Sequence, residues 1–245
     1  MKSFVIRNFL SKEEIDYLFS CSDTDWERAT SIDSKGLEVS INKSRITEHV
    51  GLQFHKLGSI PAKIIKKANH LFNKKLYTNE SISILKYDSR LKAKFDYHTD
   101  DINFTMHIDN RGRKISDPED FFIINSRPRR KVSITVALND KSDYNGGDFK
   151  IQPDGDRPIN YESVSKNVDL NLGDAVIFDS RMYHGVTPVT EGIRYSAIIW
   201  LYDLEEFYDW WRENDQIPTE GFDRFKRYYE EYDIPLWGLY KISCS

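Results

Sequence analysis

The sequence predicts a mainly β fold with flanking helices, arranged as an antiparallel double-sheet jelly roll. From residue 81 onward, short alternating or β-branched runs are separated by turn sequences, and no helical pattern lies between them. Before residue 77, a capping box and an apolar stripe indicate helices. We expect these helices to cover one side of a sheet.

Two helices are expected before the strands. Ser11-Lys-Glu-Glu14 is a capping box, so a helix should run from about residue 12 to Cys21. A second helix should begin near Ile60, where Pro61 suits the first turn, and continue to Leu76. Its apolar residues recur on one face: Ile64, Ile65, Ala68, Leu71 and Phe72.

The remaining chain divides into strands, one long insertion and a final helical segment. The expected strands are Ser81–Tyr87, Lys131–Leu138, Asp148–Gln152, Val168–Leu172, Ala175–Phe178 and Ile193–Tyr202. Asp101–Arg130 is irregular and is expected to form a surface insertion. After Tyr202 the pattern becomes helical and rich in aromatic residues, as expected for a segment that caps the sheet.

Length and composition favour a single domain over residues 1–245. It would comprise supporting helices (about 11–76), a jelly-roll core (about 81–202) and a C-terminal helical segment (about 203–245). A net charge of -4 provides no general field for nucleic acid or an anionic membrane. The 2 cysteines match no disulfide framework or zinc spacing, and no signal peptide or membrane span is evident. We therefore expect a cytoplasmic protein.

A candidate metal-binding motif follows the first expected strand. His98 and Asp100 are two residues apart, so on a strand both side chains leave the same face. A third ligand must come from elsewhere, and His184 lies where the end of an opposing strand could reach inward. Two histidines and one carboxylate form the facial triad that binds non-haem Fe(II) with open coordination positions.

The His-x-Asp motif occurs twice, because His107-Ile-Asp109 repeats it. Sheet-like residues, including Phe95 and Tyr97, surround the first copy, whereas the second leads directly into Asn110-Arg-Gly-Arg113. Context therefore favours His98 and Asp100, and His107 with Asp109 is the alternative pair.

A candidate anion site lies ten residues after His184. Arg194 sits between apolar residues of an expected strand, and Ser196 faces the same way. A buried guanidinium needs a partner, because an unpaired buried charge is unfavourable. A dicarboxylic cosubstrate would provide one through two parallel hydrogen bonds.

Together these segments resemble the Fe(II)/2-oxoglutarate-dependent dioxygenases, in particular the prolyl 4-hydroxylase-like branch. The resemblance runs from Asn8 to Trp200. It is strongest in Lys94–Asp100, Arg130–Asn139, Tyr144–Phe149 and Gly173–Ser196. These motifs occur in the order found in that family.

The resemblance implies a double-stranded β-helix that acts as a hydroxylase on a peptidyl proline or related residue. Fe(II) would be bound by His98, Asp100 and His184, with 2-oxoglutarate as cosubstrate and ascorbate as a reductant. Arg194 and Ser196 would bind the distal carboxylate together with Tyr87, whose alternative role is that of a core tyrosine. Two features depart from the family pattern: Ala137 stands where the family has a Tyr, and the linker from Asp100 to Arg130 is long.

Other functions are also open at this stage. The same chemistry could act on a small metabolite, or on a nucleobase, as suggested by basic residues that otherwise indicate a solvated loop: Arg111, Arg113, Lys114, Arg127, Arg129, Arg130 and Lys131. A catalytically silent jelly-roll binding protein is the non-enzyme alternative. The expected partner is a peptide, protein or small molecule, with no membrane, and the substrate itself is not specified.

Overall fold

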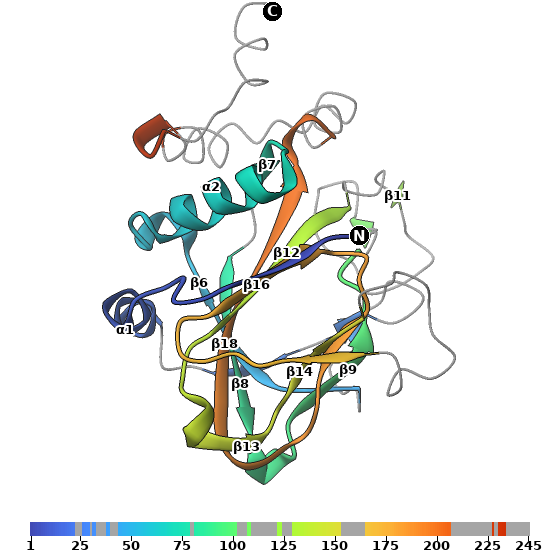
Figure 1. The fold of residues 1–245 in the computed structure, drawn as a ribbon. Coiled ribbons are helices and arrows are strands. Elements are labelled where there is room, and N and C mark those ends of the chain that lie inside the picture. The colour runs from blue at the N-terminus through green and yellow to red at the C-terminus, as the bar shows by residue number, and fades with distance from the viewer. Residues whose placement is uncertain are drawn as a thin grey trace, which may run out of the picture.

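The computed structural model describes residues 1–22, 26–29, 31–32, 38–39, 44–78, 81–101, 107–108, 122–123, 129–152, 165–206, 227 and 230–233. Within these ranges, two antiparallel sheets stack face to face, and two helices lie against the outer face of the larger sheet (Figure 1). The predicted mainly β, jelly-roll class is confirmed.

The larger sheet carries the longest strands. In spatial order, it contains β1 (Ser3–Ile6), β16 (Ala175–Asp179), β12 (Arg130–Ala137), β18 (Val189–Asp203), β8 (Ile82–Asp88), β6 (Glu48–Leu52) and β2 (Glu27–Arg28). Two further strands, β7 (Leu76–Tyr77) and β13 (Tyr144–Gly146), pair with β18.

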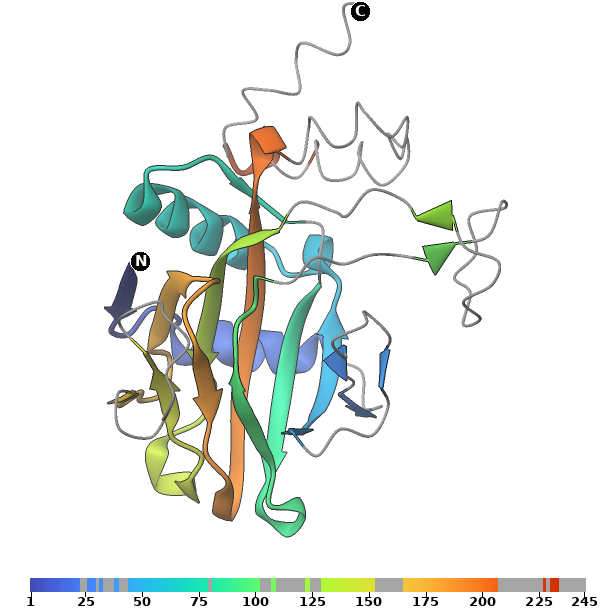
Figure 2. The same cartoon turned by 90° about the vertical axis from the view of Figure 1, so that its right-hand side faces the viewer.

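The smaller sheet faces it across the interior. Its order is β15 (Lys166–Val168), β14 (Phe149–Ile151), β17 (His184–Val186), β9 (Lys94–His98) and β5 (Arg45–Ile46). Two short ribbons pair β3 (Ser31–Ile32) with β4 (Glu38–Val39), and β10 (His107–Ile108) with β11 (Phe122–Ile123). Figure 2 shows β10 and β11 projecting to one side of the two sheets. Short 3-10 turns occupy Phe54–Lys56, Ser89–Leu91 and Lys141–Asp143.

Both predicted helices are present. Helix α1 (Lys12–Ser20) begins with the predicted capping box, in which Ser11 Oγ accepts from the Glu14 N–H and the Glu14 carboxylate accepts from the Ser11 N–H. Helix α2 (Ile60–Phe72) ends earlier than predicted, because Asn73 adopts a left-handed conformation with φ 51°. Leu76, the expected last helical residue, lies in β7 instead.

Most of the predicted strands are confirmed, with shifted ends. Val168–Leu172 is the exception, because the strand there is Lys166–Val168. Asn171 and Asp174 close a turn through two hydrogen bonds, and Gly173 occupies it with φ 81°. This geometry prevents residues 169–172 from continuing the strand.

Residues of β12 alternate between two cores. Val132, Ile134 and Val136 pack with the helices, while Ser133, Thr135 and Ala137 face the smaller sheet. The second core fills the space between the sheets with Leu85, Tyr87, Phe149, Phe178 and Val186, among others. The site described below lies in this inner layer.

Two expected segments lie largely outside the described residues. Of the 101–130 insertion, the described parts are residue 101, the β10 and β11 ribbon and residues 129–130; of the C-terminal segment, residues 204–206 are helical, as are 227, 230 and 231. Among the helices described, none is long and apolar enough to cross a membrane.

Candidate metal centre

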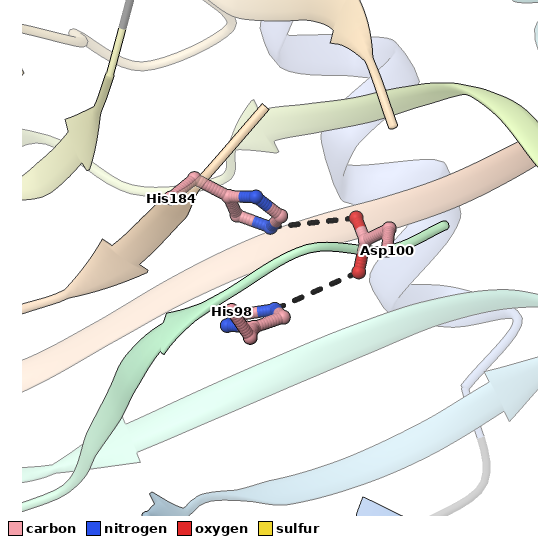
Figure 3. Close-up of side chains that lie close together, drawn as sticks. All are labelled: His98, Asp100 and His184. Atoms are coloured by element: carbon pink, nitrogen blue, oxygen red, sulfur yellow. Dashed lines mark ion pairs between the residues drawn. The ribbon is translucent and has the colours of Figure 1, made fainter. Parts of the chain in front are cut away.

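Two histidines face each other across neighbouring strands of the smaller sheet. His98 is the last residue of β9, His184 is the first residue of β17, and the two are paired in register. Asp100 lies two residues beyond β9 and points between them (Figure 3). Its carboxylate oxygens lie 3.6 Å from His98 Nε2 and 3.4 Å from His184 Nε2. These ligand atoms all lie within 4.8 Å of one another.

A β-bulge brings the first histidine into place. Val186 pairs with Phe95 and His184 pairs with His98, so Asp96 and Tyr97 together lie opposite Gly185. The extra residue shifts the alternation, which lets the Phe95 and His98 rings stack with centroids 3.6 Å apart. A Cβ on Gly185 would lie 2.9 Å from the Phe95 carbonyl oxygen, so only glycine fits without displacing β9.

Backbone carbonyls orient both imidazoles. Nδ1 of His98 lies 2.8 Å from the Asp96 carbonyl oxygen, and Nδ1 of His184 lies 3.0 Å from that of Met182. Each Nδ1 can reach a carbonyl only as an N–H donor, and this contact directs each Nε2 toward Asp100.

The carboxylate is held from the opposite sheet. The N–H groups of Asp100 and Asp101 both donate to the carbonyl oxygen of Ser180, at 2.9 and 3.1 Å. Ser180 is itself buried, and its hydroxyl bonds that of Ser133 at 2.9 Å. The carboxylate position is therefore coupled to β12 and to the turn after β16.

Protonation states in the cluster suit a metal ion. Burial lowers the pKa of His98, and His184 lowers it further, which favours the neutral ring. Burial by itself would raise the pKa of Asp100, but His184 and His98 outweigh it and hold that pKa well below its usual value. A neutral His98 imidazole and an ionised Asp100 carboxylate are donors that a two-histidine, one-carboxylate Fe(II) site requires.

Aromatic residues enclose the cluster within one cavity. Phe178 meets the His184 ring edge-on at 4.7 Å, and Phe149 lies 5.9 Å from that ring. The cavity contains about 430 Å³ of empty space, including open solvent at its mouth.

At the inner end of this cavity lies a buried arginine. Arg194 is 3% exposed, and its guanidinium donates to Ser196 Oγ at 3.2 Å. Tyr87 is its direct partner on β8, and the Arg194 guanidinium carbon lies 5.0 Å from the Tyr87 ring centroid. Burial raises the pKa of Tyr87, so its hydroxyl is protonated. Ala137, which stands where the resemblance implies a Tyr, lies in the same inner core.

The structure thus places His98, Asp100, His184, Arg194, Ser196 and Tyr87 around one cavity. The alternative ligand His107 belongs to β10, outside both large sheets, and Asp109 lies outside the described residues (Figure 2).

Two arginines that stack on lining residues of the cavity were not predicted there, and the expected place of one of them was wrong. Arg130, expected in a solvated basic loop, is 6% exposed and stacks over the Trp200 ring at 3.7 Å. Arg45 lies over the Phe95 ring at 4.7 Å. Alternate residues of a strand share a face, so counting in twos from Arg194 could have identified Trp200 as a residue that lines the cavity. No local pattern distinguishes Arg45 in this way.

Residues 83–202 match the family model described as 2OG-Fe(II) oxygenase superfamily. A PKHD-type hydroxylase of Pseudomonas putida (strain W619) is 35% identical over 103 residues, which are 42% of this chain and 39% of that protein. The aligned chain thus spans about two fifths of the length of such relatives. A PKHD-type hydroxylase of Paraburkholderia xenovorans (strain LB400) is 26% identical over 204 residues, 81% of this chain and 78% of that protein.

Solved structures share the fold. A prolyl hydroxylase of Trichoplax adhaerens, in complex with a hypoxia inducible factor peptide fragment, has a TM-score of 0.56 at 17% identity and covers 84% of this chain and 86% of its own. A viral collagen prolyl hydroxylase of Paramecium Bursaria Chlorella virus-1, as a 2OG complex, has a TM-score of 0.52 at 18% identity, with 83% and 97% covered.

The matched family range begins in β8 and ends in β18, so it includes both histidines, Asp100 and Arg194. These findings confirm the resemblance seen in the sequence. Over residues 83–202, the chain is similar to the 2-oxoglutarate- and Fe(II)-dependent oxygenase superfamily.

Proposed function

We propose that this protein is an Fe(II)- and 2-oxoglutarate-dependent dioxygenase that hydroxylates an unactivated C–H bond and releases succinate and CO2. The observation that supports it best is the sharing of one cavity by two kinds of site. A two-histidine, one-carboxylate cluster and a buried arginine both line this cavity.

In this proposal, Nε2 of His98, Nε2 of His184 and the Asp100 carboxylate hold the metal. When bound, Fe(II) supplies dioxygen activation, driven by the oxidative decarboxylation of 2-oxoglutarate. The protein orients the ligands through the Asp96, Met182 and Ser180 carbonyls, so little rearrangement accompanies metal binding.

Arg194 binds the distal carboxylate of 2-oxoglutarate in this proposal. The guanidinium is already oriented by Ser196 Oγ, and the Tyr87 hydroxyl, protonated at neutral pH, can donate a further hydrogen bond. Arginine suits this role because its planar fork matches both carboxylate oxygens.

The aromatic walls contribute by excluding water. Phe95, Phe149 and Phe178 cover the imidazole faces, which strengthens the electrostatic contacts inside and protects reactive species from side reactions.

The proposed substrate is a peptidyl proline or related residue. Support comes from the curated relatives, which are named PKHD-type hydroxylases, and from neighbours named prolyl hydroxylases.

The test is to incubate the purified chain with Fe(II), 2-oxoglutarate and candidate peptides and metabolites. Mass spectrometry should detect a gain of one oxygen atom in one compound, with an equivalent amount of succinate. The Asp100→Ala variant should produce neither. Oxygen gain that persists in this variant, or that needs no 2-oxoglutarate, contradicts the proposal.

A further inference from the structure

Two arginines stack on aromatic residues that line the cavity. The first is Arg130, at the start of β12. Its guanidinium lies 3.7 Å from the ring centroid of Trp200, which lines the cavity. Stacking uses the flat face of the guanidinium, and its five N–H donors lie in the plane of its edge.

The second is Arg45, on the edge strand of the smaller sheet. It pairs with Phe95, and its guanidinium lies 4.7 Å from that ring, which in turn stacks on His98. Burial lowers the pKa of Arg45, and the Arg130 charge acts in the same direction, while Tyr87 and Asp100 oppose it. Arg45 remains a cation, since arginine titrates far above neutral pH. The two arginines and Asp100 therefore lie within electrostatic reach of one another.

Trp200, on which Arg130 stacks, lies far along the strand from Arg194, whereas Arg45 lies within electrostatic reach of Tyr87, the strand partner of Arg194. Arg194 and Trp200 are six residues apart on β18, which corresponds to about 20 Å along an antiparallel strand. A five-carbon dicarboxylate with one end on Arg194 covers less than about half of that distance. Of the described residues that line the cavity, Asp100 is the only acid, so a second anion would meet little repulsion there.

We propose that Arg45 and Arg130 form a second carboxylate-binding element on the cavity wall, beside Phe95 and Trp200. The substrate then carries a carboxylate near the carbon that is hydroxylated, as either a main-chain terminus or an acidic side chain. This inference rests on the proposed function and specifies its substrate class.

The experiment measures binding, so it does not depend on turnover. The full chain is loaded with Mn(II) and N-oxalylglycine, an unreactive analogue of 2-oxoglutarate, and titrated calorimetrically. The probes form two kinds of matched pair. The first compares free amino acids with their amides, and the second compares proline tripeptides that carry either Glu or Gln beside the proline. Arg45→Gln and Arg130→Gln are compared with Arg28→Gln, which removes an exposed arginine on β2.

At least one carboxylate probe should bind, and its neutral counterpart should bind at least about tenfold more weakly. Arg45→Gln and Arg130→Gln should each weaken that probe by about 10- to 100-fold and leave N-oxalylglycine affinity unchanged, whereas Arg28→Gln should have no effect. Arg45→Lys, which keeps the charge, should retain part of the affinity. A main-chain carboxylate is indicated if affinity differs between the amino acids and their amides, and an acidic side chain is indicated if it differs between the Glu and Gln tripeptides.

Three outcomes overturn the inference: equal binding of acids and amides, no carboxylate binding at all, or a loss of N-oxalylglycine affinity in Arg45→Gln as large as in Arg194→Gln. The last would assign Arg45 to the cosubstrate. If Mn(II) and N-oxalylglycine fail to bind the unmodified chain, the proposed function itself fails.

Discussion

Gly185→Ala should weaken metal binding without removing any ligand. The added Cβ would lie 2.9 Å from the Phe95 carbonyl oxygen, 3.2 Å from Tyr97 N and 3.3 Å from Asp96 C. All three atoms belong to the backbone of β9, so relief requires the strands to separate by about 0.5 Å, the shortfall from ordinary contact. Metal–ligand distances tolerate only about 0.2 Å. We therefore expect metal affinity to fall by about 10- to 100-fold.

The assay is a Mn(II) titration followed by calorimetry or by the electron paramagnetic resonance of the free ion. Gly51→Ala on β6 is the matched control, because its Cβ would lie at an ordinary 3.7 Å from Ser81 Cβ. Thermal unfolding of both variants separates a local shift at the site from general loss of structure. Unchanged metal affinity in a folded Gly185→Ala protein would refute the reasoning that the bulge sets the position of His98.

Two further predictions concern stability. Burial would raise the pKa of Asp174, but the N–H groups of Asn171 and Asn8 and the Arg7 guanidinium lower it below 3.8. The ionised Asp174 carboxylate therefore stabilises the fold fully at a pH above its pKa in the unfolded chain, and this stabilisation is lost as pH falls through its pKa in the folded protein. The Asp174→Asn variant should lose about 1.5–3 kcal/mol of unfolding free energy at pH 7, and its difference from the unmodified protein should shrink below about pH 4. Denaturant titrations at both pH values check this, and a difference in unfolding free energy that stays constant with pH contradicts it. Ser11→Ala should lose about 1 kcal/mol by removing the α1 cap, measured as a fall in Tm of about 2–4 °C, and an unchanged Tm would contradict a stabilising cap.

Much of the fold could be predicted because its signals are local. The Ser11 capping box and the alternation along β12 and β18 each depend on neighbouring residues. The end of α2 was misplaced because the apolar stripe continues to Leu76, although Asn73 already ends the helix. The strand expected at Val168–Leu172 is absent because the Asp174 carboxylate accepts a hydrogen bond from the Asn171 N–H and closes a turn there.

The candidate site was only partly predictable for a related reason. His98 and Asp100 share a motif, and Arg194 and Ser196 share a strand face, so sequence spacing can suggest both pairs. Arg45 and Arg130 are brought beside the cavity wall by strand pairing between distant segments and by stacking on Phe95 and Trp200. Such contacts leave no trace in local composition, which is why Arg130 was expected in solvent.

The most direct test of the central proposal is anaerobic titration of 2-oxoglutarate into the protein with and without Fe(II). We expect 2-oxoglutarate to bind only in the presence of Fe(II), the His184→Ala variant to lose metal-dependent binding, and Arg194→Gln to keep the metal while binding 2-oxoglutarate at least about tenfold more weakly. Binding that is equal without metal, or that survives in His184→Ala, would contradict the assignment of this cavity as a 2-oxoglutarate and Fe(II) site.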